Sequence, residues 1–172
     1  MKRIALLSDT HGFLDEKILK FVKQADEIWH AGDFGTIEVC DKLASLKPLK
    51  GVYGNVDGNE IRTVYPLHQH FTCEKIKVWI THIGGYPGYY SQYVRNEIYT
   101  IKPNLFISGH SHILKVMRDK KEPAILHMNP GAAGIHGFHK IRTMMRFTID
   151  GSTIKDVEAI ELGLRGDIEN LQ

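Results

Sequence analysis

Aspartate, histidine and asparagine recur in five short clusters of this chain, each at the end of an apolar run. The clusters are Ser8-Asp9-Thr10-His11, Ala31-Gly32-Asp33, Gly54-Asn55-Val56-Asp57, Ile80-Thr81-His82 and Gly109-His110-Ser111-His112. Residues two apart in an extended segment point the same way, so an Asp-x-His or His-x-His pair can present two side chains to one point. Carboxylates, imidazoles and amide oxygens in such an arrangement suit divalent metal ions. We therefore predict a metal site.

Seven side chains in these clusters offer more donors than one cation needs, and none of them carries sulfur. The candidate ligands are Asp9, His11, Asp33, Asn55, His82, His110 and His112. Two divalent cations that share a bridging carboxylate would use this set, and we favour Mn²⁺, with Fe²⁺, Zn²⁺ and Ni²⁺ as alternatives. Two such cations with a shared hydroxide keep a net positive charge beside two carboxylates. They would attract an anionic phosphate ester and orient the hydroxide for attack on phosphorus.

Glycines directly precede three of the candidate ligands, Asp33, Asn55 and His110. Glycine adopts backbone conformations that other residues resist, and it has no side chain. We therefore expect these glycines to relax the backbone and to leave space for an ion.

Apolar runs and helical periodicity predict the elements that carry the first three clusters. We expect strands at 3–8, 27–31 and 49–53, with helices at 14–25 and 37–46 between them. Strands and helices that alternate at these lengths indicate parallel strands with helical crossovers. Because loops after the carboxyl ends of parallel strands converge on one surface, the five clusters can meet at one place.

The pattern changes after residue 58. Stretches 62–65, 70–74 and 76–81 are rich in β-forming residues, and we predict a meander of antiparallel strands there. We expect a helix at 91–101, followed by strands at 105–108, 113–118, 124–128, 142–149 and 153–160. Residues 167–172 are expected to fray.

Length and composition indicate one globular domain over residues 1–172, because a chain that is 42% hydrophobic and 24% charged can build a single core. Two cysteines without a CxxC spacing favour a reducing, cytoplasmic location. The apolar start ends at Ser8, too early for a signal peptide, and no run reaches membrane-spanning length. The net charge of +2 is spread without a basic stripe, so we expect neither membrane nor nucleic acid as a partner. The expected partner is a small-molecule phosphate ester, and a homo-oligomer stays open.

The ordered series Asp-x-His, Gly-Asp, Gly-Asn, Thr-His and Gly-His-x-His resembles the calcineurin-like metallophosphoesterase superfamily. The resemblance spans Asp9 to His112, and Asn129-Pro130-Gly131 is similar to a further loop of its small single-domain prokaryotic phosphodiesterase branch. It implies an α/β fold in the form of a four-layer sandwich, with two mixed β-sheets flanked by helices. It also implies a metal-dependent phosphodiesterase that acts on small phosphodiesters.

The resemblance further implies how the candidate ligands divide between two ions. One ion is bound by Asp9, His11 and His112. The other ion is bound by Asn55, His82 and His110. The bridging carboxylate is Asp33. The implied catalytic residues are Asp33, Asn55, His82 and His110.

Two positions depart from the family pattern. Many members have a histidine directly after the asparagine, which is thought to protonate the leaving group, and this chain has Val56 there. Many members also have Gly-His after the fourth cluster, where this chain has Ile83-Gly84. General acid catalysis typically contributes about 10²- to 10⁴-fold, so we expect slower turnover, esters with good leaving groups, or protonation by water or another histidine.

Other polar and aromatic residues have a plainer interpretation. We interpret His30 as a hydrogen-bonded core residue, and Asp57 either as a turn residue or as an orienting group for Asn55 or a metal-bound water. We treat the remaining histidines as structural or exposed: His68, His70, His127, His136 and His139. His136 and His139 are the two of these expected nearest to a substrate. Four tyrosines could stack on a nucleobase or aryl group, although we favour packing roles for them: Tyr86, Tyr89, Tyr90 and Tyr93.

Two other functions stay open. A phosphomonoesterase would use the same kind of site with different pocket walls. A non-enzymatic scaffold is the second alternative, because the retromer complex contains a subunit of the fold that the resemblance implies. Scaffolds of that kind tend to lose histidine ligands, whereas this chain keeps every position of the metal pattern.

Overall fold

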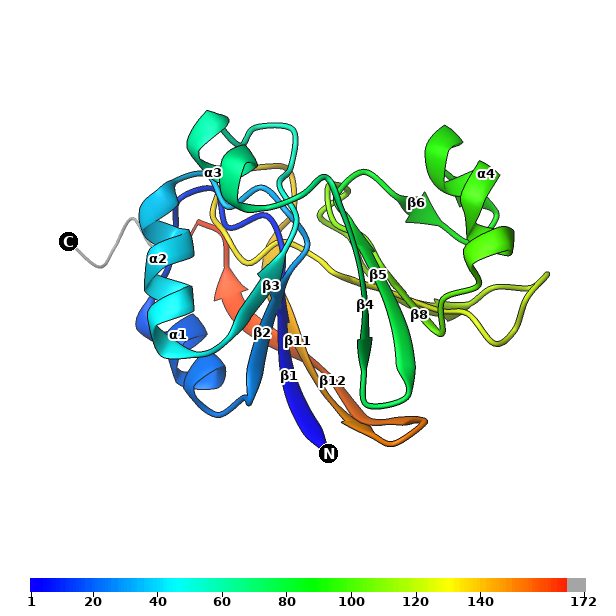
Figure 1. The fold of residues 1–172 in the computed structure, drawn as a ribbon. Helices are drawn as coiled ribbons and strands as arrows, with labels where there is room; N and C mark the ends of the chain where they lie inside the picture. Colours follow the sequence, from blue (N-terminus) through cyan, green and yellow to red (C-terminus); the bar gives the residue numbers. More distant parts are fainter. Residues whose placement is uncertain (167–172) are drawn as a thin grey trace.

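Two five-stranded mixed β-sheets form the centre of the protein, whose computed structural model describes residues 1–166 (Figure 1). The strand order in the first sheet is β12 (Thr153–Leu164), β11 (Ile141–Asp150), β1 (Lys2–Leu7), β2 (Glu27–His30) and β3 (Leu49–Gly51). The order in the second sheet is β4 (His68–Cys73), β5 (Ile76–Thr81), β8 (Leu105–Ile107), β10 (Leu126–Pro130) and β9 (Leu114–Arg118). The fraying expected at 167–172 lies outside the described residues.

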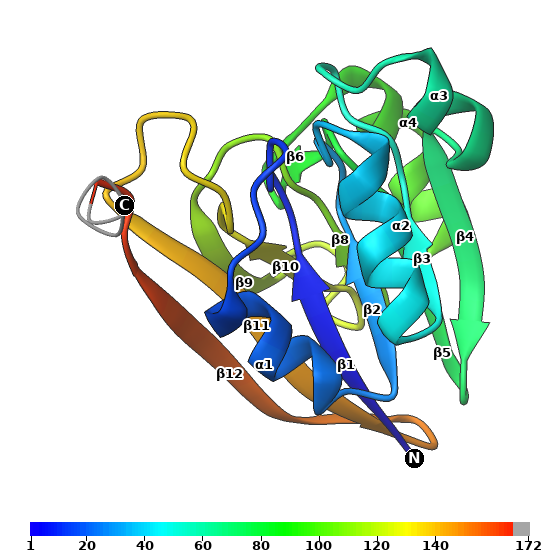
Figure 2. The ribbon, with the colours of Figure 1, turned by 90° about the vertical axis from the view of Figure 1, so that its left-hand side faces the viewer.

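Helices cover the outer faces of both sheets, as Figures 1 and 2 show. The first sheet is covered by α1 (Glu16–Lys23) and α2 (Ile37–Leu46). The second sheet is covered by α4 (Gln92–Ile101) and a short hairpin of β6 (Gly85–Tyr86) and β7 (Tyr89–Tyr90). None of the helices in residues 1–166 is long and apolar enough to cross a membrane.

Side-chain alternation along the strands produces these layers. In β1, Ile4 and Leu6 pack between the two sheets, whereas Ala5 and Leu7 pack beneath the helices of the first sheet. A third core lies between the second sheet and α4, with Trp79 at its centre. The predicted sandwich of two mixed β-sheets flanked by helices is therefore confirmed.

Six strands run parallel, and their carboxyl ends position the site. β1, β2 and β3 are parallel neighbours in the first sheet, and β5, β8 and β10 are parallel neighbours in the second. The carboxyl end of β1 lies at the end of the sandwich opposite the N-terminus (Figure 1). The expected convergence of loops follows from this topology, with the loop after β10 as a sixth member.

The antiparallel meander predicted after residue 58 is wrong in two respects. Residues 62–64 belong to the helix α3 (Asn59–Val64), because burial of Ile61 in the core under the helices outweighs the β-branched character of Thr63 and Val64. β4 and β5 form an antiparallel pair, but β5 then pairs in parallel with β8. The β6–β7 hairpin was not predicted, since strands of two residues carry no periodic signal.

Candidate metal centre

All seven predicted ligands meet at the carboxyl ends of the parallel strands. They follow β1, β2 and β3 in the first sheet and β5 and β8 in the second. The donor atoms of six of them, all except Asn55, form two groups, within each of which all atoms lie within 4.8 Å of one another. The first group is Asp9, His11 and His112. The second group is Asp33, His82 and His110.

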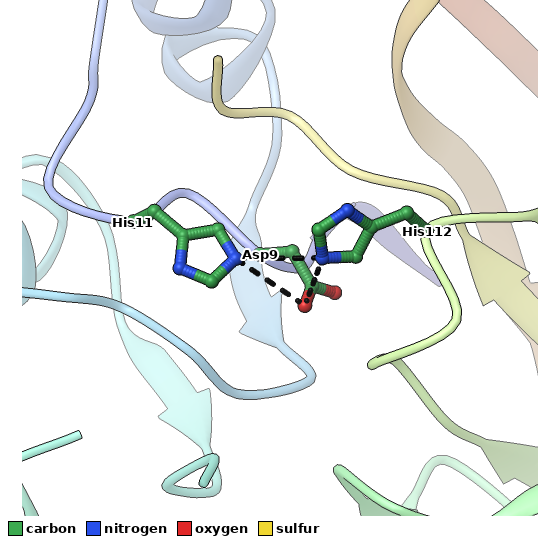
Figure 3. A group of neighbouring side chains, drawn as sticks. All are labelled: Asp9, His11 and His112. Carbon is green, nitrogen blue, oxygen red and sulfur yellow. Dashed lines mark hydrogen bonds and ion pairs between the residues drawn. The ribbon is translucent and has the colours of Figure 1, made fainter. Parts of the chain in front are cut away.

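In the first group, two imidazoles approach one carboxylate oxygen (Figure 3). The Nε2 atom of His112 lies 3.0 Å from Asp9 Oδ1, and the Nε2 atom of His11 lies 3.8 Å from it. The two Nε2 atoms are 3.4 Å apart. Three donor atoms thus surround one small space.

The second group adjoins the first through Asp33. Its Oδ2 atom lies 3.1 Å from His82 Nε2 and 3.9 Å from His11 Nε2, so it reaches both groups. The amide oxygen of Asn55 lies 3.1 Å from His82 Nε2. His110 completes this group, with its ring centroid 5.2 Å from that of His82. This geometry fits the bridging role that the family pattern implies for Asp33.

Each of the two carboxylates has one anchored oxygen and one oxygen that faces imidazoles. Asp9 Oδ2 accepts hydrogen bonds from the Ser8 hydroxyl and, at 3.1 Å, from the His110 backbone N–H. Asp33 Oδ1 accepts the Val56 backbone N–H at 3.0 Å. The opposite oxygens, Asp9 Oδ1 and Asp33 Oδ2, are the ones directed at the donor groups.

In His82 and His112, a hydrogen bond to Nδ1, the ring nitrogen far from the carboxylates, determines whether Nε2 carries a proton or a lone pair. His82 Nδ1 lies 2.7 Å from the Ala31 carbonyl oxygen, which can only accept, so this nitrogen carries the proton. His139 Nε2 likewise donates to the Gly134 carbonyl at 2.9 Å, which leaves His139 Nδ1 to accept from His112 Nδ1 at 3.2 Å. The Nε2 lone pairs of His82 and His112 therefore face the two groups, as metal ligands must.

This donor set fits divalent cations. Asp9 Oδ1 is buried and receives no hydrogen bond within the described part of the chain, although the Nε2 atoms of His112, His11 and His82 lie 3.0, 3.8 and 3.9 Å away. A carboxylate oxygen beside nitrogen lone pairs is unfavourable unless a positive charge lies among them. The mixed nitrogen and oxygen donors also match the preferences of Mn²⁺, Fe²⁺ and Zn²⁺.

The carboxylates create a negative potential in this space. Burial alone would lower the pKa of His82, but its contact with Asp33 and the charges of Asp9 and Asp33 outweigh burial and raise it. Burial alone would raise the pKa of Asp9, yet the approach of His112 and the positive charge that His82 carries when its ring is protonated lower it overall. The same potential attracts a metal cation.

The backbone at the site lies in the left-handed region at five ligands, with φ values of 47° to 66°. These residues are Asp9, His11, Asp33, His110 and His112. Such conformations are uncommon for residues other than glycine and persist only where the surrounding structure holds them. Asp57 helps to hold the backbone around Asp33, because its carboxylate accepts hydrogen bonds from the backbone N–H groups of Phe34, Gly35 and Gly54. Its position supports the turn role rather than contact with Asn55.

The glycines before three ligands make room for side chains rather than for an ion. A Cβ atom on Gly32 would lie 2.6 Å from His82 Nδ1, and one on Gly54 would lie 2.0 Å from Asp33 Oδ1. A Cβ atom on Gly109 would lie 2.1 Å from the Ser8 hydroxyl. Only Gly32 of these three has a positive φ, at 98°. The space beside these glycines is therefore filled by ligand side chains and their partners, and the expectation that it would hold an ion is wrong.

Histidines outside the seven take different roles. His30 is fully buried, stacks on Phe34 and bonds to Thr10, and burial lowers its pKa to about 3, as expected for a core residue. His139 instead orients His112, a role that sequence reasoning missed because the two residues lie in different loops. The one sequence feature that pointed toward a site role for His139 was its position shortly after Asn129-Pro130-Gly131. His136 lies beside His11 and lines a cavity that opens above the two donor groups.

The fold and site define a class of protein. Residues 1–152 match the calcineurin-like phosphoesterase superfamily domain, so the chain belongs to this superfamily and the resemblance is confirmed. A probable metallophosphoesterase of Methanothermobacter thermautotrophicus is 28% identical over 166 residues, 93% of this chain and 92% of that protein.

Solved structures share the fold at lower identity. An archaeal phosphodiesterase has a TM-score of 0.72 at 21% identity, covering 93% of this chain and 99% of that one. Wild-type Vps29 from Entamoeba histolytica complexed with Zn²⁺ has a TM-score of 0.70 at 15% identity, covering 92% and 98%. At these identities the likeness shows the fold alone.

Gly54→Ala should weaken metal binding, because the new Cβ would collide with Asp33 Oδ1 and displace that carboxylate. We expect the affinity for Mn²⁺, measured by titration calorimetry, to fall by at least about 10-fold, as for other losses of ligand support. Gly58→Ala is the matched control, since its Cβ would meet no atom within 4 Å. Equal Mn²⁺ affinity of the two folded variants would contradict this account.

His139→Phe should also weaken metal binding, because it keeps an aromatic ring but removes the acceptor that fixes the His112 tautomer. The expected loss of Mn²⁺ affinity is about 10- to 100-fold, the usual effect of a residue that orients a ligand. His68→Phe is the control, since His68 stacks on Tyr93 and does not line the cavity above the donor groups. An unchanged dissociation constant in folded His139→Phe would refute the orienting role.

Proposed function

We propose that this metallophosphoesterase is a phosphodiesterase that hydrolyses small phosphodiesters at a centre of two divalent cations. The observation that carries the proposal is the pair of donor groups that meet at Asp33, with Asp9 Oδ1 buried among three imidazole nitrogens and free of hydrogen bonds within the described residues. Cations in the two groups would activate a shared water and neutralise charge on the phosphate. Mn²⁺ remains the ion that we favour.

The chain's own residues have distinct tasks in this proposal. Asp9, His11 and His112 would hold one cation, and Asp33 would contact both. The second cation would be held by Asn55, His82 and His110. Of these, Asn55 and His110 are exposed to the cavity of about 520 Å³ above the centre, so they lie where an ester would enter. A covalent nucleophile from the protein is not required.

The walls of this cavity favour a diester over a monoester. Its lining includes exposed Val56, Ile113 and Phe138, and it contains no lysine or arginine among the described residues. A monoester carries a second negative charge that a basic side chain would stabilise, whereas a diester carries one charge and two organic arms. Apolar walls suit those arms. Val56 cannot protonate a leaving group, so we expect aryl esters to react fastest.

Exposed apolar residues around the cavity are also what a protein-interaction scaffold would need. The fold of Vps29 fits that alternative, while the retained donor atoms favour the enzyme. Activity therefore decides between them.

Asp33→Ala should remove both metal binding and turnover, because one carboxylate serves both donor groups. We expect hydrolysis of bis(p-nitrophenyl) phosphate with Mn²⁺ to fall by at least about 10³-fold, with weaker Mn²⁺ binding in calorimetry. Asp41→Ala, on the exposed face of α2, is the matched control. An active Asp33→Ala enzyme would count against the two-cation centre.

A diester and its monoester should react at different rates. We expect kcat/KM for bis(p-nitrophenyl) phosphate to exceed that for p-nitrophenyl phosphate by at least about 10-fold, since apolar walls do not compensate the second charge. A reversed ratio would identify a phosphomonoesterase. No hydrolysis of either ester by Mn²⁺-loaded protein would favour the scaffold.

A further inference from the structure

A groove of about 280 Å³ adjoins the cavity of about 520 Å³ above the metal centre, which we call the metal-site cavity. The two spaces share three lining residues, His110, Ser111 and Ile113. Its other walls include residues of the β6–β7 hairpin, of β9 and β10, and of the loops after β5 and β8. A molecule with phosphorus at the metal centre could therefore extend into this groove without leaving the protein surface.

Strand register explains which side chains line the groove. Lys115 on β9 pairs with Asn129 on β10, so these two residues share one face of the second sheet. His127 lies two residues before Asn129 and therefore points to the same face. This is the outer face, beneath the hairpin, because Met128 points into the core between the sheets.

Two tyrosines of the hairpin form an aromatic wall. The rings of Tyr86 and Tyr89 lie 5.1 Å apart, and Tyr89 is 74% exposed. The Lys115 ammonium lies 3.6 Å from the centre of the Tyr86 ring and brings a positive charge to the same wall. Tyr86 is half-buried. An aromatic wall with an exposed ring and a cation beside it is typical of surfaces that bind planar, electron-rich rings.

The other two tyrosines of this region are occupied within the fold. Tyr90 is buried and donates its hydroxyl hydrogen to Asp119 at 2.7 Å. Tyr93 stacks on His68 at a centroid distance of 4.3 Å. The packing role expected for all four tyrosines therefore holds for these two, and Tyr86 and Tyr89 differ from them.

His127 lines the groove and is fixed by hydrogen bonds of its neighbours. The Ser108 hydroxyl donates to the Gly85 carbonyl at 2.9 Å, so it accepts from His127 Nε2, also at 2.9 Å. His127 Nδ1 then carries a lone pair, and this buried atom has no hydrogen-bond partner within residues 1–166.

We propose that this groove binds a planar aromatic arm of the phosphate ester, either an aryl group or a nucleobase, against Tyr86 and Tyr89. The inference rests on the proposed function, because the phosphate must sit at the metal centre for its arm to reach the groove. Shared lining residues connect the two spaces, the hairpin supplies stacking surface, and Lys115 lies where a ring carbonyl or nitrogen would accept its hydrogen bond.

Phosphonates test the groove without hydrolysis, because their P–C bond is not a substrate bond. Titration calorimetry of Mn²⁺-loaded protein would compare methylphosphonate, phenylphosphonate and the methylene analogue of AMP. Stacking on an aromatic side chain should make at least one of the two aromatic ligands bind about 10-fold tighter than methylphosphonate. If both aromatic ligands bind tighter than methylphosphonate, the groove accepts any planar ring. If only the AMP analogue binds tighter, the groove is specific for a nucleobase.

Variants of the hairpin tyrosines then test whether the tighter binding of the aromatic ligands depends on the β6–β7 hairpin. Tyr86→Ala and Tyr89→Ala should each lose most of it while leaving the methylphosphonate affinity unchanged, and Tyr89→Phe should retain it. Tyr93→Ala is the control, since its ring lies outside the groove. The proposal that the groove binds the aromatic arm would be refuted by equal affinities of all three ligands for the unaltered protein. It would also be refuted if both alanine variants bound the aromatic ligands as tightly, relative to methylphosphonate, as the unaltered protein does. Hydrolysis of bis(p-nitrophenyl) phosphate is measured in parallel, and an inactive Mn²⁺-loaded protein would overturn the proposed function as well.

Discussion

Two carboxylates at the end of the sandwich each turn one oxygen toward imidazole lone pairs, and the arrangement of the site depends on this interaction. Asp9 and Asp33 are buried, and each has its other oxygen held by hydrogen-bond donors. Burying a carboxylate costs several kcal/mol unless a partner compensates it. Neutral imidazoles do not compensate it, because they present lone pairs. A cation among these atoms would satisfy both kinds of donor at once.

The fold holds this unfavourable arrangement by surrounding it with regular structure. Five of the seven candidate ligands have left-handed backbone conformations, and each follows a parallel strand that is buried in a core. Asp57 ties the loops after β2 and β3 together through three backbone N–H groups. The far nitrogens of His82 and His112 are bound by a backbone carbonyl and by His139. The donor atoms are therefore positioned before any ion binds.

Much of this could be predicted from sequence, because parallel strands impose a simple rule. Residues that follow their carboxyl ends converge, so the seven candidate ligands could be grouped without knowing the strand order. The helix α3 was missed since its one buried turn depends on a tertiary contact of Ile61. The role of His139 was missed for a similar reason: its partner His112 lies in another loop, and no local spacing connects the two. The glycines were correctly singled out, but only coordinates reveal that ligand side chains fill the space beside them.

The balance between enzyme and scaffold rests on the cost of keeping the donor groups. A protein that acted only through its surface would gain stability if buried Asp9 or His82 were replaced by apolar residues of similar size. This chain instead retains both, together with the carbonyl of Ala31 that orients His82. Apolar residues such as Val56 and Ile113 lie at the rim of the same cavity, where they contact whatever reaches the donors. Donors below and apolar walls above are the combination that the proposed phosphodiesterase would use to hold a phosphate with organic arms.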